Sequence, residues 1–331
     1  KKVFRVNERP ISFMSDTTHV PVMPREVLEG LNIQKGDTVV DATLGGGGHA
    51  LLVLEKILPG GTLFACDQDG EAVERFRTRL DRNTRYASAV QDGSVQLIHT
   101  RFSDIGEAIR KQGVSRVSAV FADLGLSSDQ LGDAARGFSF LREGPLDMRF
   151  DRECGETAGD IVNDWDEQML SRVFREYGGV RDAGRLAKAI VQRRSEKRFE
   201  TTTEFAEFVQ QVSRDRHASI HPATKVFQAL RIAVNREQES IEEFLRDAIG
   251  LLKTGGRIAV LSFHSGEERT VKRIFSEDAR GCVCPKEFPV CRCGKKARLR
   301  VLTKRAMVPR DEEYRENPRA RSAKLRIAER I

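Results

Sequence analysis

The stretch that decides the fold is Asp37-Thr-Val-Val-Asp-Ala-Thr-Leu-Gly-Gly-Gly-Gly-His49. Its first eight residues are rich in β-branched and apolar side chains, as a buried parallel strand requires. Four glycines, Gly45–Gly48, follow at once, and residues without a side chain let a bound molecule approach the backbone. The next segment, His49–Leu58, has the apolar density of a helix that packs on a sheet. The order of strand, glycine loop and helix predicts the first half of a βαβ unit.

The same alternation continues along the chain. We expect further strands at Thr62–Cys66, Val95–His99, Val117–Ala122 and Arg257–Phe263, and helices at Pro24–Leu31, Glu71–Leu80, Ile105–Lys111, Thr224–Val234 and Ile241–Leu252. Arg298–Thr303 and Ala323–Glu329 are expected to complete the sheet as a hairpin. Strands that alternate with helices predict an α/β fold with a doubly wound, mostly parallel sheet that binds its ligand at the carboxyl ends of the strands.

The rhythm changes between residues 133 and 216, where amphipathic helices follow one another without convincing strands. They are Leu170–Tyr177, Arg185–Arg194 and Thr203–Val212, the last opened by a Thr201/Glu204 capping box. We therefore predict a discontinuous α/β domain, residues 1–132 and 217–331, interrupted by an all-helical insertion, residues 133–216.

Length and composition set outer limits. The chain has 331 residues, 39% of them hydrophobic and 32% charged, which is typical of a globular protein of two domains, or of one with a large insertion. No uncharged apolar run approaches the roughly 20 residues of a membrane helix. The first residues lack the apolar stretch of a secretory signal, so we expect a cytosolic protein. Six cysteines are too few for a disulfide scaffold.

The net charge of +7 is unevenly distributed. Gly281–Ile331 holds 15 Lys and Arg against 6 Asp and Glu, and Arg172–Arg198 holds 9 against 3, which leaves −8 for the rest of the chain. Clustered cations favour a polyanionic partner, because phosphate binding releases counterions. Solvated helix faces and a basic tail explain the charge alone equally well.

The glycine loop fits two cofactors. Gly45-x-Gly47-x-x-Ala50 satisfies the dinucleotide fingerprint, and Asp67 lies 20 residues after Gly47, where a ribose-binding acid is expected. A carboxylate at Asp41, however, would repel a pyrophosphate placed over the loop. S-adenosylmethionine has no phosphate and carries a sulfonium and an ammonium group, so Asp41 favours the methyl donor over a nicotinamide dinucleotide.

Other residues can be assigned around that donor. Asp67 suits the ribose hydroxyls, or is a solvent-exposed strand end, and Phe102 lines the adenine pocket, or is a core aromatic residue. The segment Asp123–Gln130 (DLGLSSDQ) follows the fourth strand and faces the reacting methyl group. Asp123 and Gln130 are candidates to accept hydrogen bonds from a target amine or to hold the methionine end of the donor.

Histidines and cysteines leave alternatives open. His264 and His221 are candidates for the base that takes a proton from a methylated amine, or are hydrogen-bonded capping or core residues. Four cysteines, Cys282, Cys284, Cys291 and Cys293, have a spacing that permits a tetrahedral zinc site. A redox pair or unliganded thiols are the alternatives, whereas Cys66 is most simply a buried strand residue.

Several motifs together resemble the small-subunit ribosomal RNA methyltransferase H family (RsmH, also called MraW). These motifs are His19–Val22, Gly45–His49, Asp123–Ser128 (DLGLSS), Arg136–Arg149 (RGFSFLREGPLDMR), His221–Asn235 (HPATKVFQALRIAVN), Ser262–Arg273 (SFHSGEERTVKR) and Asn317–Arg330 (NPRARSAKLRIAER). The resemblance implies a class I, Rossmann-like methyltransferase that uses S-adenosylmethionine to methylate the exocyclic N4 of a cytidine in the decoding region of ribosomal RNA. It places the donor contacts on Gly47, Gly48, His49, Asp67, Phe102, Asp123 and Gln130.

The chain departs from the family at Leu126, Asp129 and Gly266, which affects local loop shape. It also lacks the Asn/Asp-Pro-Pro-aromatic motif that DNA amino-methyltransferases carry after the fourth strand. The base-holding acceptor therefore has no precedent there. Our hypothesis is that Asp123, the Ser127/Ser128 turn and the Asp147–Arg149 loop shape the cytosine pocket.

The resemblance also implies a partner, either small-subunit ribosomal RNA or the assembling small subunit. The insertion resembles the family's RNA-recognition domain, in which Arg172–Arg198 would contact phosphates. Four cations near the end of the chain are either a strand face or an RNA contact: Arg319, Arg321, Lys324 and Arg326. The alternative functions are an NAD-dependent oxidoreductase, which Asp41 disfavours, and a non-catalytic RNA-binding assembly factor.

Overall fold

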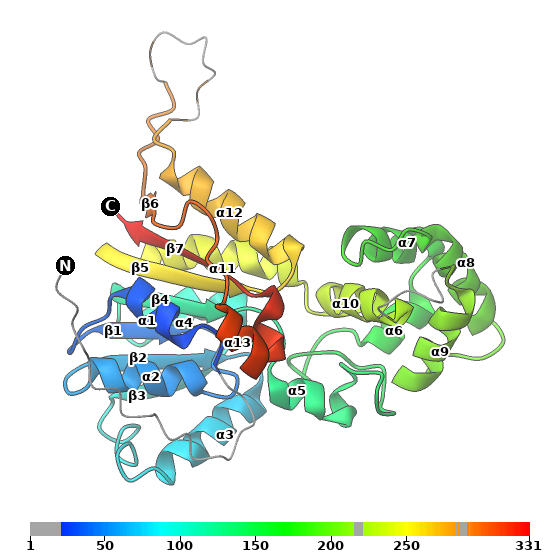
Figure 1. Cartoon of the computed structure of the whole chain (residues 1–331), viewed down its shortest axis with the longest axis horizontal. Helices are drawn as coiled ribbons and strands as arrows, with labels where there is room; N and C mark the ends of the chain where they lie inside the picture. The colour runs from blue at the N-terminus through cyan, green and yellow to red at the C-terminus, as the bar shows by residue number, and fades with distance from the viewer. Residues whose placement is uncertain (1–20, 215–220, 283, 285–289, 291) are drawn as a thin grey trace.

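A seven-stranded sheet forms the centre of the molecule (Figure 1). The computed structural model describes residues 21–214, 221–282, 284, 290 and 292–331. Across these residues the strand order is β3-β2-β1-β4-β5-β7-β6, with β1 to β5 parallel and β7 antiparallel to both of its neighbours. The strands are β1 (Thr38–Asp41), β2 (Thr62–Asp67), β3 (Val95–His99), β4 (Val117–Asp123), β5 (Leu252–Ser262), β6 (Leu299–Val301) and β7 (Lys324–Arg330). The predicted α/β class, with a doubly wound and mostly parallel sheet, is confirmed.

Helices cover both faces of the sheet because successive strand residues point to opposite sides. Val39 belongs to one hydrophobic core and Val40 to the other, and the same alternation holds along β2, β4 and β5. The first core includes residues of α1 (Pro24–Leu31), α2 (Gly48–Ile57) and α3 (Gly70–Asp81). The second includes residues of α4 (Ile105–Lys111), α11 (Glu237–Leu251) and α12 (Ser265–Ala279). Strands buried on both faces explain the nearly continuous apolar runs in the sequence.

The last two strands pair as expected, but β7 occupies an unexpected place. It lies between β5 and β6, with Leu261 opposite Leu325 on one side and Val301 opposite Ala328 on the other. Both faces of β7 are therefore buried: Leu325 and Ile327 join the first core, and Ala328 joins the second. Pairing can be predicted from the apolar pattern of two strands, but insertion between two others depends on tertiary packing.

The helical insertion forms a lobe beside the sheet (Figure 1). Its helices are α6 (Ala158–Asp164), α7 (Glu167–Glu176), α8 (Ala183–Arg194) and α9 (Thr202–Val212). We did not predict α6, although Thr157 and Asp160 form a complete capping box at its start. At α9, the side chain of Thr201 accepts the N–H of Glu204 as expected, but the Glu204 carboxylate accepts from Glu200 rather than from the cap residue.

The core of this lobe extends beyond residue 216. Ala223, Phe227 and Leu230 of α10 (Pro222–Val234) belong to the same hydrophobic cluster as Phe174 of α7. We propose that the domain boundary follows α10 rather than residue 216. No helix among the described residues has the length and apolar character needed to span a bilayer.

A buried ion pair joins the lobe to the sheet domain. Arg136 is 2% exposed, and its Nη1 donates to Oδ2 of Asp69 at 2.8 Å. Its Nη2 donates to the carbonyl oxygens of Arg149 and Phe150, at 3.1 and 2.7 Å. Asp69 is also the N-cap of α3, directly after β2. The start of the insertion is thus fixed to the carboxyl end of the sheet.

Candidate functional site

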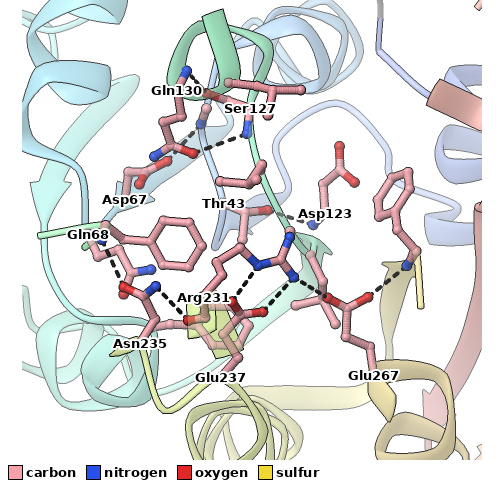
Figure 2. A pocket seen from close by; sticks show the side chains of 18 of the residues that line it. Thr43, Asp67, Gln68, Asp123, Ser127, Gln130, Arg231, Asn235, Glu237 and Glu267 are labelled. Carbon is pink, nitrogen blue, oxygen red and sulfur yellow. Dashed lines mark hydrogen bonds and ion pairs between the residues drawn. The ribbon is translucent and has the colours of Figure 1, made fainter. Parts of the chain in front are cut away.

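A cavity of about 460 Å³ lies at the carboxyl ends of β1, β2 and β4, where the sheet meets α10 (Figure 2). One wall is built by the glycine loop, by the segments that follow β2 and β4, and by η1 (Phe102–Asp104). The opposite wall comes from α10, α11 and α12, with Gln228, Arg231, Asn235, Glu237, His264 and Glu267. The predicted residues Gly48, His49, Asp67, Phe102, Asp123, Ser127 and Gln130 all line the cavity. Segments far apart in sequence therefore converge on one site.

Gly47 shapes the glycine loop from behind the cavity wall. It precedes the first residue of α2 and has a φ of 72°, a left-handed conformation that favours glycine. A Cβ atom at this position would lie 2.2 Å from Cδ2 of Phe76 on α3. Gly47 is not among the lining residues, so its role is to let the loop turn and pack against Phe76.

We expect a Gly47→Ala substitution to disrupt both the loop and donor binding. Gly113, with a φ of 77° and no atom within 4 Å of an added Cβ, is the matched control. Gly113→Ala should lose only the roughly 1–2 kcal/mol of left-handed strain. Gly47→Ala should lose more, because the Phe76 ring must also move. Thermal unfolding and calorimetric titration with S-adenosylmethionine measure both effects, and equal losses in the two variants would show that strain alone matters.

Three carboxyl groups lie at or beneath the floor of the cavity. Asp67 accepts the N–H of Gly45 on Oδ2 at 2.8 Å and the N–H of Asp69 on Oδ1 at 2.9 Å. Asp41, at the end of β1, is 1% exposed and accepts the N–H of Thr43 on Oδ1. Oδ2 of Asp41 and Oδ1 of Asp123 are buried without a hydrogen-bond partner among the described residues. Buried acceptors without partners are a feature of sites that await a ligand with donors or positive charge.

Burial raises the pKa of all three acids. The pKa of Asp41 rises to about 7 and that of Asp67 to about 6, although backbone N–H groups stabilise both carboxylates. Burial, together with repulsion from Asp41 and Glu267, raises the pKa of Asp123 to about 8. Each pKa is raised because desolvation and like charge disfavour the ionised form. A bound cation would reverse this effect.

We therefore expect the affinity for S-adenosylmethionine to increase as the pH rises from about 6 to about 8.5. Binding of a cationic donor requires the carboxylate forms, so it releases protons. For each proton released, the affinity increases by up to about tenfold per pH unit. The stability of the donor-free protein should change with pH in the opposite direction. Acids with raised pKa values stabilise the fold at low pH, and this contribution is lost as the pH rises. Calorimetry in buffers of different ionisation enthalpy counts the protons. Affinity independent of pH would contradict this account.

Gln130 and Ser127 support the wall rather than reach freely into the cavity. Oγ of Ser127 accepts the N–H of Gln130, and Oε1 of Gln130 accepts the N–H of Ser127, both at 3.1 Å. This capping box begins α5 (Ser128–Gly132). Nε2 of Gln130 donates to Oδ2 of Asp69 at 3.0 Å, the same oxygen that holds Arg136. Ser128 is the first residue of α5 and is not among the residues that line the cavity.

Two aromatic contacts fix the remaining donor-side residues. Phe102 is 9% exposed and stacks on Phe244 of α11, with ring centroids 4.0 Å apart. It is therefore both a core residue and a cavity wall. The ring of His49 packs on Phe121, its Nε2 lies 2.9 Å from the carbonyl oxygen of Val22, and its Nδ1 lies 3.8 Å from Oδ2 of Asp123. His49 thus lies beside the Asp123 carboxylate.

The wall opposite the donor loop contains a buried charge network that we did not predict. Arg231 lies between Glu237 and Glu267 (Figure 2). Its Nε and Nη2 donate to the two carboxylate oxygens of Glu237 at 2.7 and 2.9 Å, and Nη2 lies 3.8 Å from Glu267. Burial raises the pKa of Glu237, whereas His264 and Arg231 hold the pKa of the buried Glu267 below its usual value. The guanidinium occupies the space between the acids, as a metal ion would otherwise do.

Both candidate histidines cap helices. His264 is the N-cap of α12, and its Nδ1 accepts the N–H groups of Gly266 and Glu267. Nε2 therefore carries the proton and faces Oε1 of Glu267 at 3.0 Å. His221 is the N-cap of α10 and accepts the N–H of Ala223. With Nδ1 engaged in this way, neither ring offers a free base, although His264 lines the cavity.

The loop between η2 (Ala134–Arg136) and α6 reaches the cavity through Phe150, not through Asp147. Asp147 forms hydrogen bonds with Nε and Nη2 of Arg149 at 2.8 and 2.9 Å and is not among the lining residues. Although burial opposes it, Arg149 holds the pKa of Asp147 below its usual value. Asn235 accepts the N–H of Phe150 and donates to the carbonyl oxygen of Met148, which ties α10 to this loop.

The sequence is similar to known proteins over nearly its whole length. The "Ribosomal RNA small subunit methyltransferase H" of Pelobacter propionicus is 48% identical over 96% of this chain and 100% of its own length. The protein of the same name from Thermomicrobium roseum is 46% identical over 98% of this chain and 96% of its own. A solved rRNA methylase from Streptococcus thermophilus aligns with a TM-score of 0.39 and 10% identity over 93% of each chain, too low to bear on function. The sequence profile of the MraW methylase family matches residues 16–331, so the chain belongs to that family.

Proposed function

We propose that this protein transfers a methyl group from S-adenosylmethionine to the exocyclic N4 of a cytidine in small-subunit ribosomal RNA. The observation that carries the proposal is the cavity itself, in which an acidic donor end faces a second, polar wall. The two methyltransferase H relatives support ribosomal RNA of the small subunit as the substrate. The cytidine N4 position rests on the family resemblance. Such a substrate implies action in the cytoplasm.

The residues at the donor end suit a cationic cofactor without phosphates. Asp67, whose carboxylate accepts the N–H groups of Gly45 and Asp69, would accept the ribose hydroxyls, and Phe102 would line the adenine pocket. Asp123, which lines the cavity, would accept a hydrogen bond from the donor's ammonium group or from the target amine. A dinucleotide would bring its pyrophosphate against Asp41, so an NAD-dependent oxidoreductase is disfavoured.

When bound, S-adenosylmethionine supplies an electrophilic methyl group on a positively charged sulfur. The target nitrogen forms a bond to that methyl carbon as the carbon–sulfur bond breaks, and the nitrogen then loses one proton. No covalent protein nucleophile is needed, so the protein acts by aligning the groups and excluding water. We assign the alignment of the target amine to Asp123, which lines the cavity and whose pKa is raised to about 8 by burial. The Asp123 carboxylate would accept a hydrogen bond from the amine and align the nitrogen lone pair with the methyl group.

Few of the basic residues in Arg172–Arg198 are free for RNA. Most are engaged in the lobe: Arg172 pairs with Glu176, Arg193 with Glu204 and Arg198 with Asp164. Within the described part of the chain, Arg181 and Lys188 are exposed and make no such contact. Near the end of the chain, Arg326 is 6% exposed and pairs with Glu268, so it is structural.

Arg321 remains available near the cavity. It is exposed in η3 (Pro318–Ser322), next to Ser322, which lines the cavity. Lys324 is half-buried at the start of β7, and the side chain of Arg319 lies outside the described residues. Three exposed cations, Arg181, Lys188 and Arg321, are therefore the phosphate contacts that we propose.

We expect the triple variant Arg181→Gln, Lys188→Gln and Arg321→Gln to bind ribosomal RNA more weakly and with a flatter salt dependence. Each lost phosphate contact should lower the slope of log K against log salt by about 0.7–0.9. The matched control is Lys35→Gln, an exposed cation before β1, at the amino end of the parallel strands. RNA binding titrations at several salt concentrations, with calorimetry for the donor, test this. An equal loss of donor affinity would show that the cations are structural.

Donor binding separates this function from the alternatives. Calorimetric titration with S-adenosylmethionine and with NAD should show tight binding of the first and none of the second. The reverse result would favour the oxidoreductase. Donor binding without methyl transfer to any small-subunit RNA preparation would favour the non-catalytic assembly factor.

A further inference from the structure

The connection between α12 and β6 contains a cluster of sulfur atoms that is separate from the methyl-donor cavity. Cys282, Cys284 and Cys293 bring their Sγ atoms within 4.8 Å of one another. None of the three lines the cavity. Cys291, the fourth cysteine of the sequence pattern, lies outside the described residues. We propose that the three described thiolates bind a zinc ion.

The spacing of the sulfurs matches a metal site. Sγ of Cys293 lies 3.8 Å from Sγ of Cys282. With zinc–sulfur bonds of about 2.3 Å, neighbouring sulfurs of a tetrahedral site lie about 3.8 Å apart. A disulfide would require about 2.05 Å. The third sulfur lies within 4.8 Å of both, so one ion could contact all three, and a fourth ligand would complete its coordination.

Backbone groups around the cluster favour thiolates. The N–H of Cys284 donates to Sγ of Cys282 at 3.4 Å, and the N–H of Arg292 donates to Sγ of Cys284 at 3.3 Å. Hydrogen bonds to sulfur stabilise its negative charge, and a thiol must lose its proton to bind zinc. A zinc ion with three thiolates has a net charge of −1. Lys295 and Lys296 follow directly and supply nearby positive charge.

A metal would also supply what this segment lacks. The described residues between Arg280 and Arg298 contribute nothing to the three hydrophobic cores. Contacts with α12 lie at the base of the segment, where Lys295 Nζ donates to the carbonyl oxygen of Glu277 and Arg298 pairs with Asp278. A segment without a hydrophobic core gains its folding energy from metal binding in many small domains. Zinc would join residues 282 and 293 and hold the outer part of the connection.

Zinc content tests the proposal without reference to methylation. The full chain, produced in zinc-containing medium and purified without chelators, should contain about one zinc ion per molecule by elemental mass spectrometry. Cys282→Ser, Cys284→Ser and Cys293→Ser should each lose that zinc. Cys154→Ser is the matched control, because Cys154 lies in the loop before α6, where it contacts Arg101 and Asp151. Circular dichroism and donor binding should be unchanged in all four, because cavity and core are untouched.

Cobalt gives a direct reading of the ligands. Cobalt added to metal-free protein should produce the thiolate-to-metal absorption and the visible bands of a tetrahedral sulfur site, and these should disappear in Cys293→Ser. Removal of zinc should increase cleavage by trypsin after Lys295 and Lys296. Absence of metal from the wild-type protein, full zinc in all three cluster variants, or a Cys282–Cys293 disulfide in protein alkylated at cell lysis would each overturn the proposal.

Discussion

An Asp123→Asn variant is expected to bind S-adenosylmethionine about 10- to 100-fold more weakly and to lose most methyl transfer. The substitution keeps the shape and the hydrogen-bonding oxygen but removes the negative charge from a side chain that is 15% exposed and whose Oδ1 is buried without a partner among the described residues. A hydrogen bond to a charged group contributes about 1.5–3 kcal/mol, which corresponds to that range of affinity. The pH dependence of donor binding should also weaken above pH 7, because the acid with the highest pKa of the three is gone.

Asp129→Asn is the matched control for this variant. Asp129 lies on α5, close in sequence to Asp123, and is not among the residues that line the cavity. It should bind the donor with nearly wild-type affinity. Calorimetry across pH 6–8.5 compares the three proteins. If Asp123→Asn bound the donor as tightly as wild type and lost only turnover, Asp123 would act on the target amine alone, and if it changed neither, its proposed place in the site would be wrong.

An Arg231→Met variant is expected to lose about 3–5 kcal/mol of unfolding free energy. Arg231 is the cation between two buried carboxylates, Glu237 at 8% exposure and Glu267 at 0%. Removing one member of a buried ion pair leaves its partner charged and desolvated, which is why the loss exceeds that of any surface pair. The methionine fills much the same volume, so the loss measures charge rather than packing. Urea unfolding followed by circular dichroism measures it.

Two further variants identify the cause. Arg231→Met combined with Glu237→Gln should recover part of the stability, because one of the unpaired charges is removed. Arg172→Met is the control for an exposed pair, since Arg172 and Glu176 are both more than half exposed, and it should change stability by about 0.5 kcal/mol or less. Loss of the same size in Arg172→Met, or no recovery in the double variant, would contradict the role of the buried network.

The donor half of the site could be predicted because each of its residues directly follows a strand. The glycine loop follows β1, Asp67 ends β2 and Asp123 ends β4, so a βαβ pattern is enough to bring them to one edge. The burial and the hydrogen-bond partners of these residues could not be predicted in the same way. Only the structure shows that Asp123 is half-buried beside His49 and that Gln130 is engaged by Ser127 and Asp69.

The opposite wall could not be predicted, because its residues come from three helices and meet only through tertiary packing. Arg231 stands in the apolar segment Ala229–Val234, and a lone arginine there was the available signal of a buried partner. The same limit applies to β7, whose place between β5 and β6 makes Arg326 a structural residue. Charge counts identified basic segments, but the ion pairs in the fold decide which cations remain exposed.

The most direct test of the proposed function is methyl transfer to ribosomal RNA. Purified small subunits that lack the modification, and the RNA extracted from them, are each incubated with the protein and isotopically labelled S-adenosylmethionine, and the nucleosides are then identified by mass spectrometry. We expect labelled N4-methylcytidine in at least one of the two substrates, and none with the Asp123→Asn variant at the same donor concentration. No transfer to either substrate, or label in a different nucleoside, would contradict the proposed function.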